Sequence, residues 1–134
     1  MAKFLQLAAS RAFTTSLQRL RNVFTVSDSE TFMEKVLNND VPVIVNFHAE
    51  WCDPCKLLTP KLEELVVPLP GIDLAIIDVE SCPELVQAFE VKAVPAVIAV
   101  RSGLVVDKFI GLVDAQNIED FIKKLSKQMQ TNAT

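Results

Sequence analysis

Apolar and polar positions along the chain follow two periods, one typical of strands and one typical of helices. Short apolar runs rich in Val and Ile predict strands, and apolar residues spaced three or four apart predict amphipathic helices between them. The predicted strands are 23–26, 41–47, 72–79, 96–101 and 104–110. The predicted helices begin near Asp28 or Ser29, Pro54, Pro83 and Asp114, each a residue typical of a helix start.

The order of these elements is βαβαβαββα, which predicts an α/β fold. Run 41–47 is apolar without clean alternation, as in a central strand covered on both faces. Helices between strands indicate a parallel core with helices on both faces of the sheet. Ser102-Gly103 predicts a tight turn, so the last two strands should add an antiparallel C-terminal hairpin to a mixed central sheet. The residues of the second helix that are expected to face inward are Leu57, Leu58, Leu62 and Leu65.

Residues 1–22 differ from the rest of the chain in composition. They contain basic residues but no acidic one, and they are rich in Ala, Ser and Thr. This composition and a weak amphipathic pattern predict a mitochondrial transit peptide, and hence a location in the mitochondrial matrix. A secretory signal is the weaker alternative because the apolar run 4–9 is short, and a tail without a targeting role is the third. The folded domain is then 23–127, followed by a short C-terminal tail, 128–134.

Composition and charge narrow the class of protein. The chain has 134 residues, and 50% of them are apolar, which suits one domain with a substantial core. The net charge of −4 gives no electrostatic support to nucleic-acid binding. No apolar run approaches the ~18 residues of a membrane span. Three cysteines are too few for a disulfide-stapled secreted scaffold. The pattern shows no exposed apolar stripe, so a monomer is expected.

The stretch Glu50-Trp51-Cys52-Asp53-Pro54-Cys55-Lys56 carries the candidate chemistry. It lies between a predicted buried strand and a predicted helix, so the two cysteines fall at a helix N-terminus. Unpaired backbone N–H groups and the positive end of the helix dipole favour thiolate over thiol there. Residues at i and i+3 share one helix turn, so the two sulfurs can also close a short disulfide. The pattern predicts thiol–disulfide exchange, in which one cysteine attacks and the other resolves.

Together with residues further along the chain, this stretch resembles the thioredoxin family, and within it the mitochondrial type. The resemblance covers about residues 23–125. It rests on Phe47-His48-Ala49-Glu50-Trp51-Cys52, Pro54-Cys55-Lys56, Asp78, Val94-Pro95, Gly103, Val105-Val106-Asp107-Lys108-Phe109 and Gly111. A lone C-x-x-C is a weak signal, whereas this combination is specific. The resemblance implies the thioredoxin fold and a disulfide-reductase activity.

Site roles carried over from the family begin with the cysteine pair. By resemblance, Cys52 is the attacking nucleophile, Cys55 is the buried resolving thiol, and the two form a redox-active disulfide with no bound cofactor. Trp51 shapes the substrate surface. Val94 presents its backbone to a substrate strand beside Pro95, whose peptide bond is expected to be cis. The resemblance also implies re-reduction by an NADPH-dependent thioredoxin reductase and disulfide-containing substrates such as peroxidases.

Three positions depart from the family pattern. Asn46 stands where the family has a buried Asp, and Ile76 stands where the next strand usually carries a buried Lys. Loss of both is physically coherent because an unpaired buried charge is costly. Asn46 cannot titrate, so a slower resolving step at Cys55 is expected. Asp53 replaces a Gly and should repel the Cys52 thiolate, which makes the couple more reducing. An exposed Asp53 screened by solvent is the alternative.

Besides an enzyme, the sequence leaves a binding module open. Such a thioredoxin-like domain captures cysteine-containing partners and turns over weakly. The departures at Asn46 and Asp53 favour it, whereas the presence of both motif cysteines argues against it. Accumulation of a mixed disulfide distinguishes this module from a working reductase.

A metal site is the third alternative, and it uses the single His and all three cysteines. Its notional Cys₃His set is His48, Cys52, Cys55 and Cys82. The spacing is loose, and Pro54, a residue expected to tune the cysteine pair, suits a disulfide better than a metal-ligand turn. Separately, His48 is either a base near Cys52 or a packing or surface residue. Cys82 is either a reactive third thiol or a small buried residue at a helix start.

Overall fold

The computed structural model describes residues 22–132, so the predicted transit peptide lies outside the described residues except for Asn22. The elements are β1 (Val23–Val26), α2 (Ser29–Phe32), the π-helical turn η1 (Met33–Leu37), β2 (Val43–His48), α3 (Asp53–Val66), β3 (Asp73–Asp78), α4 (Pro83–Ala88), β4 (Ala96–Arg101), β5 (Leu104–Ile110) and α5 (Ala115–Asn132). Helix α5 takes in most of the residues assigned to a C-terminal tail. Within the described part of the chain, none of the helices has the length and apolar character needed to cross a membrane.

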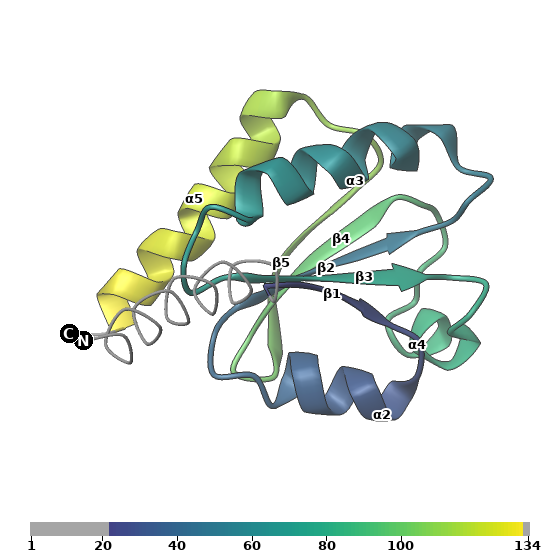
Figure 1. The fold of residues 1–134 in the computed structure, drawn as a ribbon, viewed down its shortest axis with the longest axis horizontal. Helices are drawn as coiled ribbons and strands as arrows, with labels where there is room; N and C mark the ends of the chain where they lie inside the picture. Colours follow the sequence, from purple (N-terminus) through teal and green to yellow (C-terminus); the bar gives the residue numbers. More distant parts are fainter. Residues whose placement is uncertain (1–21, 133–134) are drawn as a thin grey trace, which may run out of the picture.

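Five strands form one sheet in the order β1-β3-β2-β4-β5. Strand β3 pairs in parallel with β1 and β2, whereas β4 is antiparallel to both β2 and β5. The predicted mixed sheet, with a parallel core and an antiparallel C-terminal hairpin, is confirmed. Figure 1 shows α3 and α5 on one face of the sheet and α2 and α4 on the other. Strand β2 is therefore central, paired on both edges and covered on both faces.

The side chains of β2 alternate between two apolar clusters. Val43, Val45 and Phe47 pack in the cluster that also contains buried residues of α2, η1 and α4. Ile44 packs in the second cluster, with the inward faces of α3 and α5. Every residue from 43 to 47 is buried. The lack of alternation in the sequence thus reflects a strand without a solvent face.

The first helix is α-helical for only one turn and continues as the π-helical η1. Asp28 caps it, because its Oδ1 accepts the backbone N–H of Thr31 at 2.6 Å. This hydrogen bond lowers the pKa of the Asp28 carboxyl from its ordinary value. Phe32 and Val36 both stay buried across the change of helix type. The sequence predicted the cap but not the π-helical turn, because apolar residues four apart fit either kind of helix.

Helix α3 buries one stripe of side chains, and this stripe differs at one residue from the predicted one. Leu58 and Leu62 are fully buried, and Leu65 is half-buried. Leu57 was expected to face inward, but 66% of it is exposed, so this expectation is wrong. Successive helical residues point about 100° apart. A stripe centred on Leu58 therefore turns Leu57 toward solvent.

Asn22 ties the start of the domain to the end of α3. Its Nδ2 donates to the carbonyl oxygens of Val66 at 3.1 Å and Val67 at 3.3 Å. Its own carbonyl accepts the backbone N–H of Leu74 at 2.6 Å. The first two bonds satisfy carbonyls that a helix C-terminus otherwise leaves unpaired. Asn22, which the sequence reading assigned to the transit peptide, thus takes part in the fold.

The burial difference between two leucines of α3 gives a stability prediction. Leu62→Ala should lower the free energy of unfolding by about 2–5 kcal/mol, because it empties a fully buried position. Leu57→Ala is the matched control in the same helix and should change this free energy by less than about 0.5 kcal/mol. Urea unfolding of the two variants measures both values. Equal losses would contradict the assigned orientation of α3.

Candidate active site

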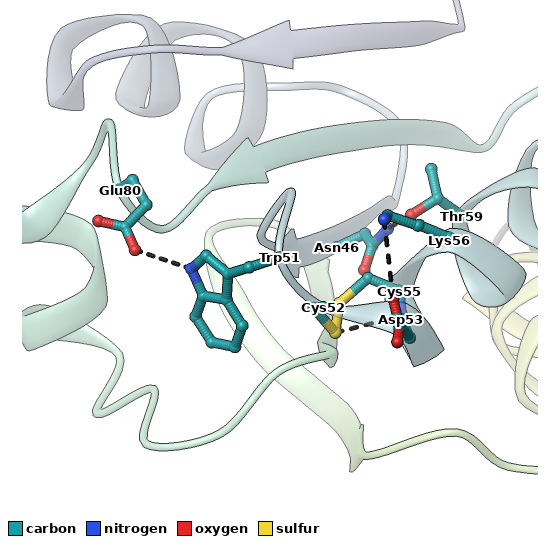
Figure 2. The surroundings of a disulfide bond; sticks show 8 residues. All are labelled: Asn46, Trp51, Cys52, Asp53, Cys55, Lys56, Thr59 and Glu80. Carbon is teal, nitrogen blue, oxygen red and sulfur yellow. Dashed lines mark hydrogen bonds and ion pairs between the residues drawn. A yellow bond between two sulfur atoms is a disulfide. The ribbon is translucent and has the colours of Figure 1, made fainter.

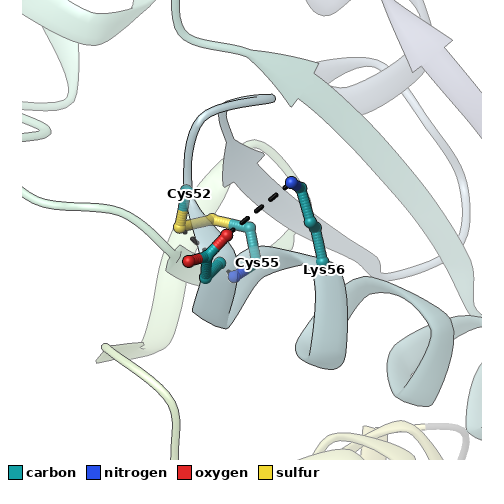
Figure 3. Close-up of polar contacts among 4 residues, drawn as sticks. Cys52, Cys55 and Lys56 are labelled. Carbon is teal, nitrogen blue, oxygen red and sulfur yellow. Dashed lines mark hydrogen bonds and ion pairs between the residues drawn. A yellow bond between two sulfur atoms is a disulfide. The ribbon is translucent and has the colours of Figure 1, made fainter.

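The cysteine pair lies where β2 gives way to α3. Cys52 is the N-cap of α3, with an extended backbone and an Sγ that accepts the backbone N–H of Cys55 at 3.2 Å. A disulfide joins the two sulfurs across one helix turn (Figure 3). Pro54 lies in the first turn, where a helix does not need its backbone N–H. A backbone N–H directed at Cys52 Sγ is also the kind of donor that stabilises a thiolate.

Very little of the disulfide reaches the surface. Cys52 is 4% exposed and Cys55 is 2% exposed, and Val94 packs against them. The Val94–Pro95 peptide bond is cis, which confirms the expectation carried over from the family. The Pro95 carbonyl accepts the backbone N–H of Gly111 at 2.8 Å. The loop containing Val94 therefore forms one wall beside the sulfurs.

Trp51 stands next to the disulfide with most of its side chain in solvent. It is 66% exposed, and its Nε1 donates to Glu80 Oε1 at 2.9 Å (Figure 2). This bond links the motif to the turn after β3 and orients the indole ring. An exposed aromatic ring held in one orientation is suited to contact another protein. The sequence pointed to Trp51 but gave no sign of Glu80.

Asn46 and Thr59 form a buried polar contact behind the cysteine pair. Asn46 is 0% exposed, and its Nδ2 donates to Thr59 Oγ1 at 2.8 Å. Its Oδ1 has no hydrogen-bond partner among the described residues. Figure 2 shows the amide between Thr59 and the disulfide. Ile76 is the partner of Asn46 on β3, so an apolar residue flanks the amide there. The sequence reading singled out Asn46 and missed Thr59.

Asp53 and Lys56 form an ion pair on the solvent side of the motif. Lys56 Nζ lies 3.7 Å from Asp53 Oδ1, and the two side chains are 65% and 92% exposed (Figure 2). An exposed pair of this kind contributes no more than about 1 kcal/mol to stability. The ion pair affects the charge near Cys52 more than it affects stability, because Lys56 offsets part of the negative charge of Asp53. The geometry favours the screened alternative for Asp53 over strong repulsion.

Cys82 is a buried thiol at the start of α4. It is 4% exposed, and its Sγ lies 3.6 Å from the carbonyl oxygen of Val26. Burial raises the pKa of the Cys82 thiol, and the negative charges of Asp28 and Asp78 raise it further. Because the thiolate is the reactive form, such a thiol is a poor nucleophile. The structure thus favours the small buried residue over the reactive third thiol.

The notional metal set is divided between two parts of the molecule. Cys82 packs in the cluster with β1 and α4, whereas Cys52 and Cys55 pack together at the start of α3. Among the described residues, no three His, Cys, Asp or Glu side chains are grouped so that they could hold a metal ion. His48 is half-buried at the end of β2. It lines an open groove of about 550 Å³ together with Cys55.

Comparisons with known proteins agree with this geometry. The family model described as Thioredoxin matches residues 22–124. The chain is 45% identical over 103 residues to a protein named mitochondrial thioredoxin from Mus musculus, covering 76% of this chain and 62% of that one. It is 41% identical over 117 residues to a protein named probable thioredoxin-2 from Caenorhabditis elegans, covering 82% of this chain and 81% of that one.

A solved structure extends the likeness to the fold. The crystal structure of Malassezia sympodialis thioredoxin (Mala s 13) superposes with a TM-score of 0.70 at 25% identity, covering 78% of this chain and 90% of that one. The chain spans only 62% of the length of the rodent relatives that it matches. The family match nevertheless includes every strand of the sheet and both cysteines of the motif. The protein belongs to the thioredoxin family.

Proposed function

We propose that this protein is a thiol–disulfide oxidoreductase that reduces protein disulfides through its Cys52–Cys55 couple. The observation that carries this proposal is the cysteine pair at the start of α3. Its two sulfurs are bonded to each other, and Cys52 Sγ accepts a backbone N–H. That donor and the positive end of the helix dipole favour a thiolate at Cys52 once the disulfide is reduced. Membership of the thioredoxin family supports the same activity.

Reduction proceeds by two successive sulfur exchanges. The Cys52 thiolate attacks one sulfur of a substrate disulfide, which forms a mixed disulfide and releases the other substrate sulfur as a thiolate that takes up a proton. Cys55 then loses its proton and attacks Cys52 Sγ. This second exchange releases the remaining substrate thiol and re-forms the Cys52–Cys55 disulfide. Two electrons pass from the protein dithiol to the substrate, so the sulfurs themselves carry the electrons and no bound cofactor takes part.

The substrate meets the protein at Trp51, Val94 and Pro95. Trp51 offers an exposed ring oriented by Glu80. Val94 packs against the cysteines on another side, so its backbone lies beside the reacting sulfurs. An extended substrate segment laid along Val94 brings its own sulfur to Cys52. Pro95 has no backbone N–H, so it cannot compete for the Cys52 thiolate.

Partners and location follow from the family and from the N-terminal segment. A thioredoxin reductase that uses NADPH is the proposed electron donor, and disulfide-containing proteins such as peroxidases are the proposed substrates. The mammalian relatives are named mitochondrial thioredoxins. Segment 1–22 is basic and free of acidic residues, as transit peptides are. Together these features support a location in the mitochondrial matrix.

A binding module that holds cysteine-containing partners is the second candidate. The specific observation in its favour is the buried Asn46 amide behind the cysteines. An amide cannot accept the proton that Cys55 must lose, so the mixed disulfide should persist longer than it does with a carboxylate in that place. A module of this kind differs from a reductase in turnover and not in its first chemical step.

Insulin disulfide reduction tests the proposed activity directly. With NADPH and thioredoxin reductase, the full chain should consume NADPH in proportion to the insulin disulfides reduced. Cys52→Ser should abolish turnover because it removes the attacking sulfur. Cys55→Ser should stop after one exchange and leave a stable mixed disulfide. NADPH consumption that survives in Cys52→Ser would refute the reductase. A wild-type protein that stops at the mixed disulfide would favour the binding module.

Asn46→Asp tests the contribution of the buried amide. A carboxylate at this position can accept the Cys55 proton, so the mixed disulfide should resolve about tenfold faster, a modest effect for a positioned base. Rapid quenching followed by mass spectrometry measures the decay of the mixed disulfide. Thr59→Val is the matched control, because it removes the hydroxyl bonded to Asn46 without adding a titratable group. An unchanged decay rate in Asn46→Asp would show that Asn46 does not affect the resolving step at Cys55.

Asp53→Gly tests the charge beside Cys52. Removing the carboxylate favours the Cys52 thiolate and so the reduced form, which should raise the reduction potential by about 10 mV for an exposed, screened charge. Equilibration against a glutathione redox buffer measures this potential. Glu64→Gln is the matched control, since Glu64 is paired with Lys61 at 3.8 Å on the same helix but far from the motif. A potential that falls or stays the same in Asp53→Gly would contradict the assigned sign.

A further inference from the structure

We propose that His48 accepts the proton of Cys55 in the resolving step, through water in the groove that both residues line. The proposal rests on the thiol–disulfide exchange proposed above and assigns it a proton acceptor. Asn46 lies behind the cysteines but cannot titrate, so the acceptor has to be another group. The argument for His48 comes from the packing of β2 against α3.

The alternation of β2 places His48 on the same face as Asn46. Ile44 on this strand packs with α3 and α5, and side chains two apart on a strand share a face. Asn46 satisfies this rule, because it is hydrogen bonded to Thr59 on α3. His48 is the next residue on this face, at the end of β2. It therefore projects toward the first turn of α3.

The Asn46–Thr59 contact also fixes which residue of α3 lies opposite His48. Strands β2 and β3 are parallel and α3 connects them, so α3 runs antiparallel to β2, as Figure 1 shows. Two residues forward along β2 cover about 6.6 Å. Four residues back along α3 cover about 6 Å. Stepping from Asn46 to His48 on the strand thus matches stepping from Thr59 to Cys55 on the helix.

The groove supplies the path between the two side chains. His48, Cys55 and Thr59 all line this open depression, whose volume is about 550 Å³. One water occupies about 30 Å³ in the liquid, so the groove accommodates several. A water hydrogen bonded to both the imidazole and the Cys55 thiol can pass the proton between them.

Charged side chains lie near His48 on three neighbouring elements. Asp78 is its partner on β3, Glu50 lies on the loop after β2, and Lys56 lies on α3; Glu50 and Lys56 also line the groove. Imidazole is the side chain that ordinarily changes charge between pH 5 and 8. His48 thus has both the position and the chemistry of a proton acceptor.

The assigned step balances in atoms and electrons. In the mixed disulfide, the proton of Cys55 passes through water to His48 as the Cys55 sulfur attacks Cys52 Sγ. The Cys52–substrate bond breaks, and its electron pair leaves with the substrate sulfur. The imidazolium then returns its proton to the leaving thiolate or to solvent. His48 ends the cycle neutral, and the Cys52–Cys55 disulfide is formed.

Rapid mixing of the reduced full chain with dithiobis(nitrobenzoate) separates the two exchanges. Attack by Cys52 releases one coloured thiol, and resolution by Cys55 releases the second. In the wild type, the second rate should rise by less than tenfold per pH unit and then level off, because a protein group accepts the Cys55 proton. In His48→Gln, it should be about 100-fold slower near neutral pH, the lower end of general-base effects. It should then rise tenfold per pH unit, as free thiol ionisation demands.

Controls distinguish this role from a structural one and from failure of the proposed function. Glu50→Gln changes a carboxylate in the same groove and should keep the wild-type pH profile, and added imidazole should speed the second phase of His48→Gln. A second phase in His48→Gln with the wild-type rate and profile overturns the inference alone. A first phase that survives Cys52→Ser overturns the exchange mechanism itself. If His48→Gln does not fold, a wild-type second phase that rises tenfold per pH unit without levelling off still overturns the inference.

Discussion

The burial of residues 43–47 of β2 is the constraint on which the rest of the molecule depends. The strand is paired on both edges and packed on both faces, so its position and its register are fixed. The chain leaves this strand at His48 and begins α3 four residues after Ala49, with Cys52 as its N-cap. A rigid strand end therefore positions the first turn of the helix, where backbone N–H groups face the attacking sulfur. The reactive pair is placed by the core of the protein and not by a flexible loop.

The same packing places one polar contact inside the apolar layer between β2 and α3. The Asn46 amide keeps a hydrogen bond to Thr59 but has an oxygen without a partner, and a buried unsatisfied group costs about 1–3 kcal/mol. With Ile76 beside it, the site avoids the larger cost of an unpaired buried charge. Asn46 and Ile76 are both uncharged, so they preserve the packing near Cys55 but leave no buried group there that could accept a proton. In the proposed mechanism, the acceptor of the Cys55 proton is therefore His48, further along the strand in the groove.

The sequence predicted those features that depend on neighbouring residues. Strand and helix order, the C-terminal hairpin and the helix start at the cysteine pair all follow from periodicity and from Pro or Gly signals within a few positions. The sequence could not predict contacts between residues that are far apart in the chain, because these depend on how the helices pack on the sheet. Asn46 meets Thr59 across 13 positions, and Trp51 meets Glu80 across 29. The orientation of Leu57 depends on which face of α3 packs against the sheet. Because Leu57 and Leu58 are both apolar, the sequence did not show which of them faces inward. The roles predicted for the two cysteines rested on the resemblance to the thioredoxin family as much as on their position at a helix start.

Exposure around the disulfide bears on which substrates suit the proposed thiol–disulfide exchange. Cys52 is almost buried, whereas the neighbouring Trp51 is largely exposed. The sulfur of Cys52 therefore lies below the surface, next to an aromatic ring that projects into solvent. Thiol–disulfide exchange needs the attacking sulfur in contact with its target sulfur. We therefore expect that a disulfide within a flat, rigid surface cannot reach Cys52 past this ring and the loop that contains Val94. A disulfide on a protruding or locally unfolded segment can, because its backbone enters the space between them. In the proposed exchange, the geometry of the site thus favours substrates according to how their disulfide is presented.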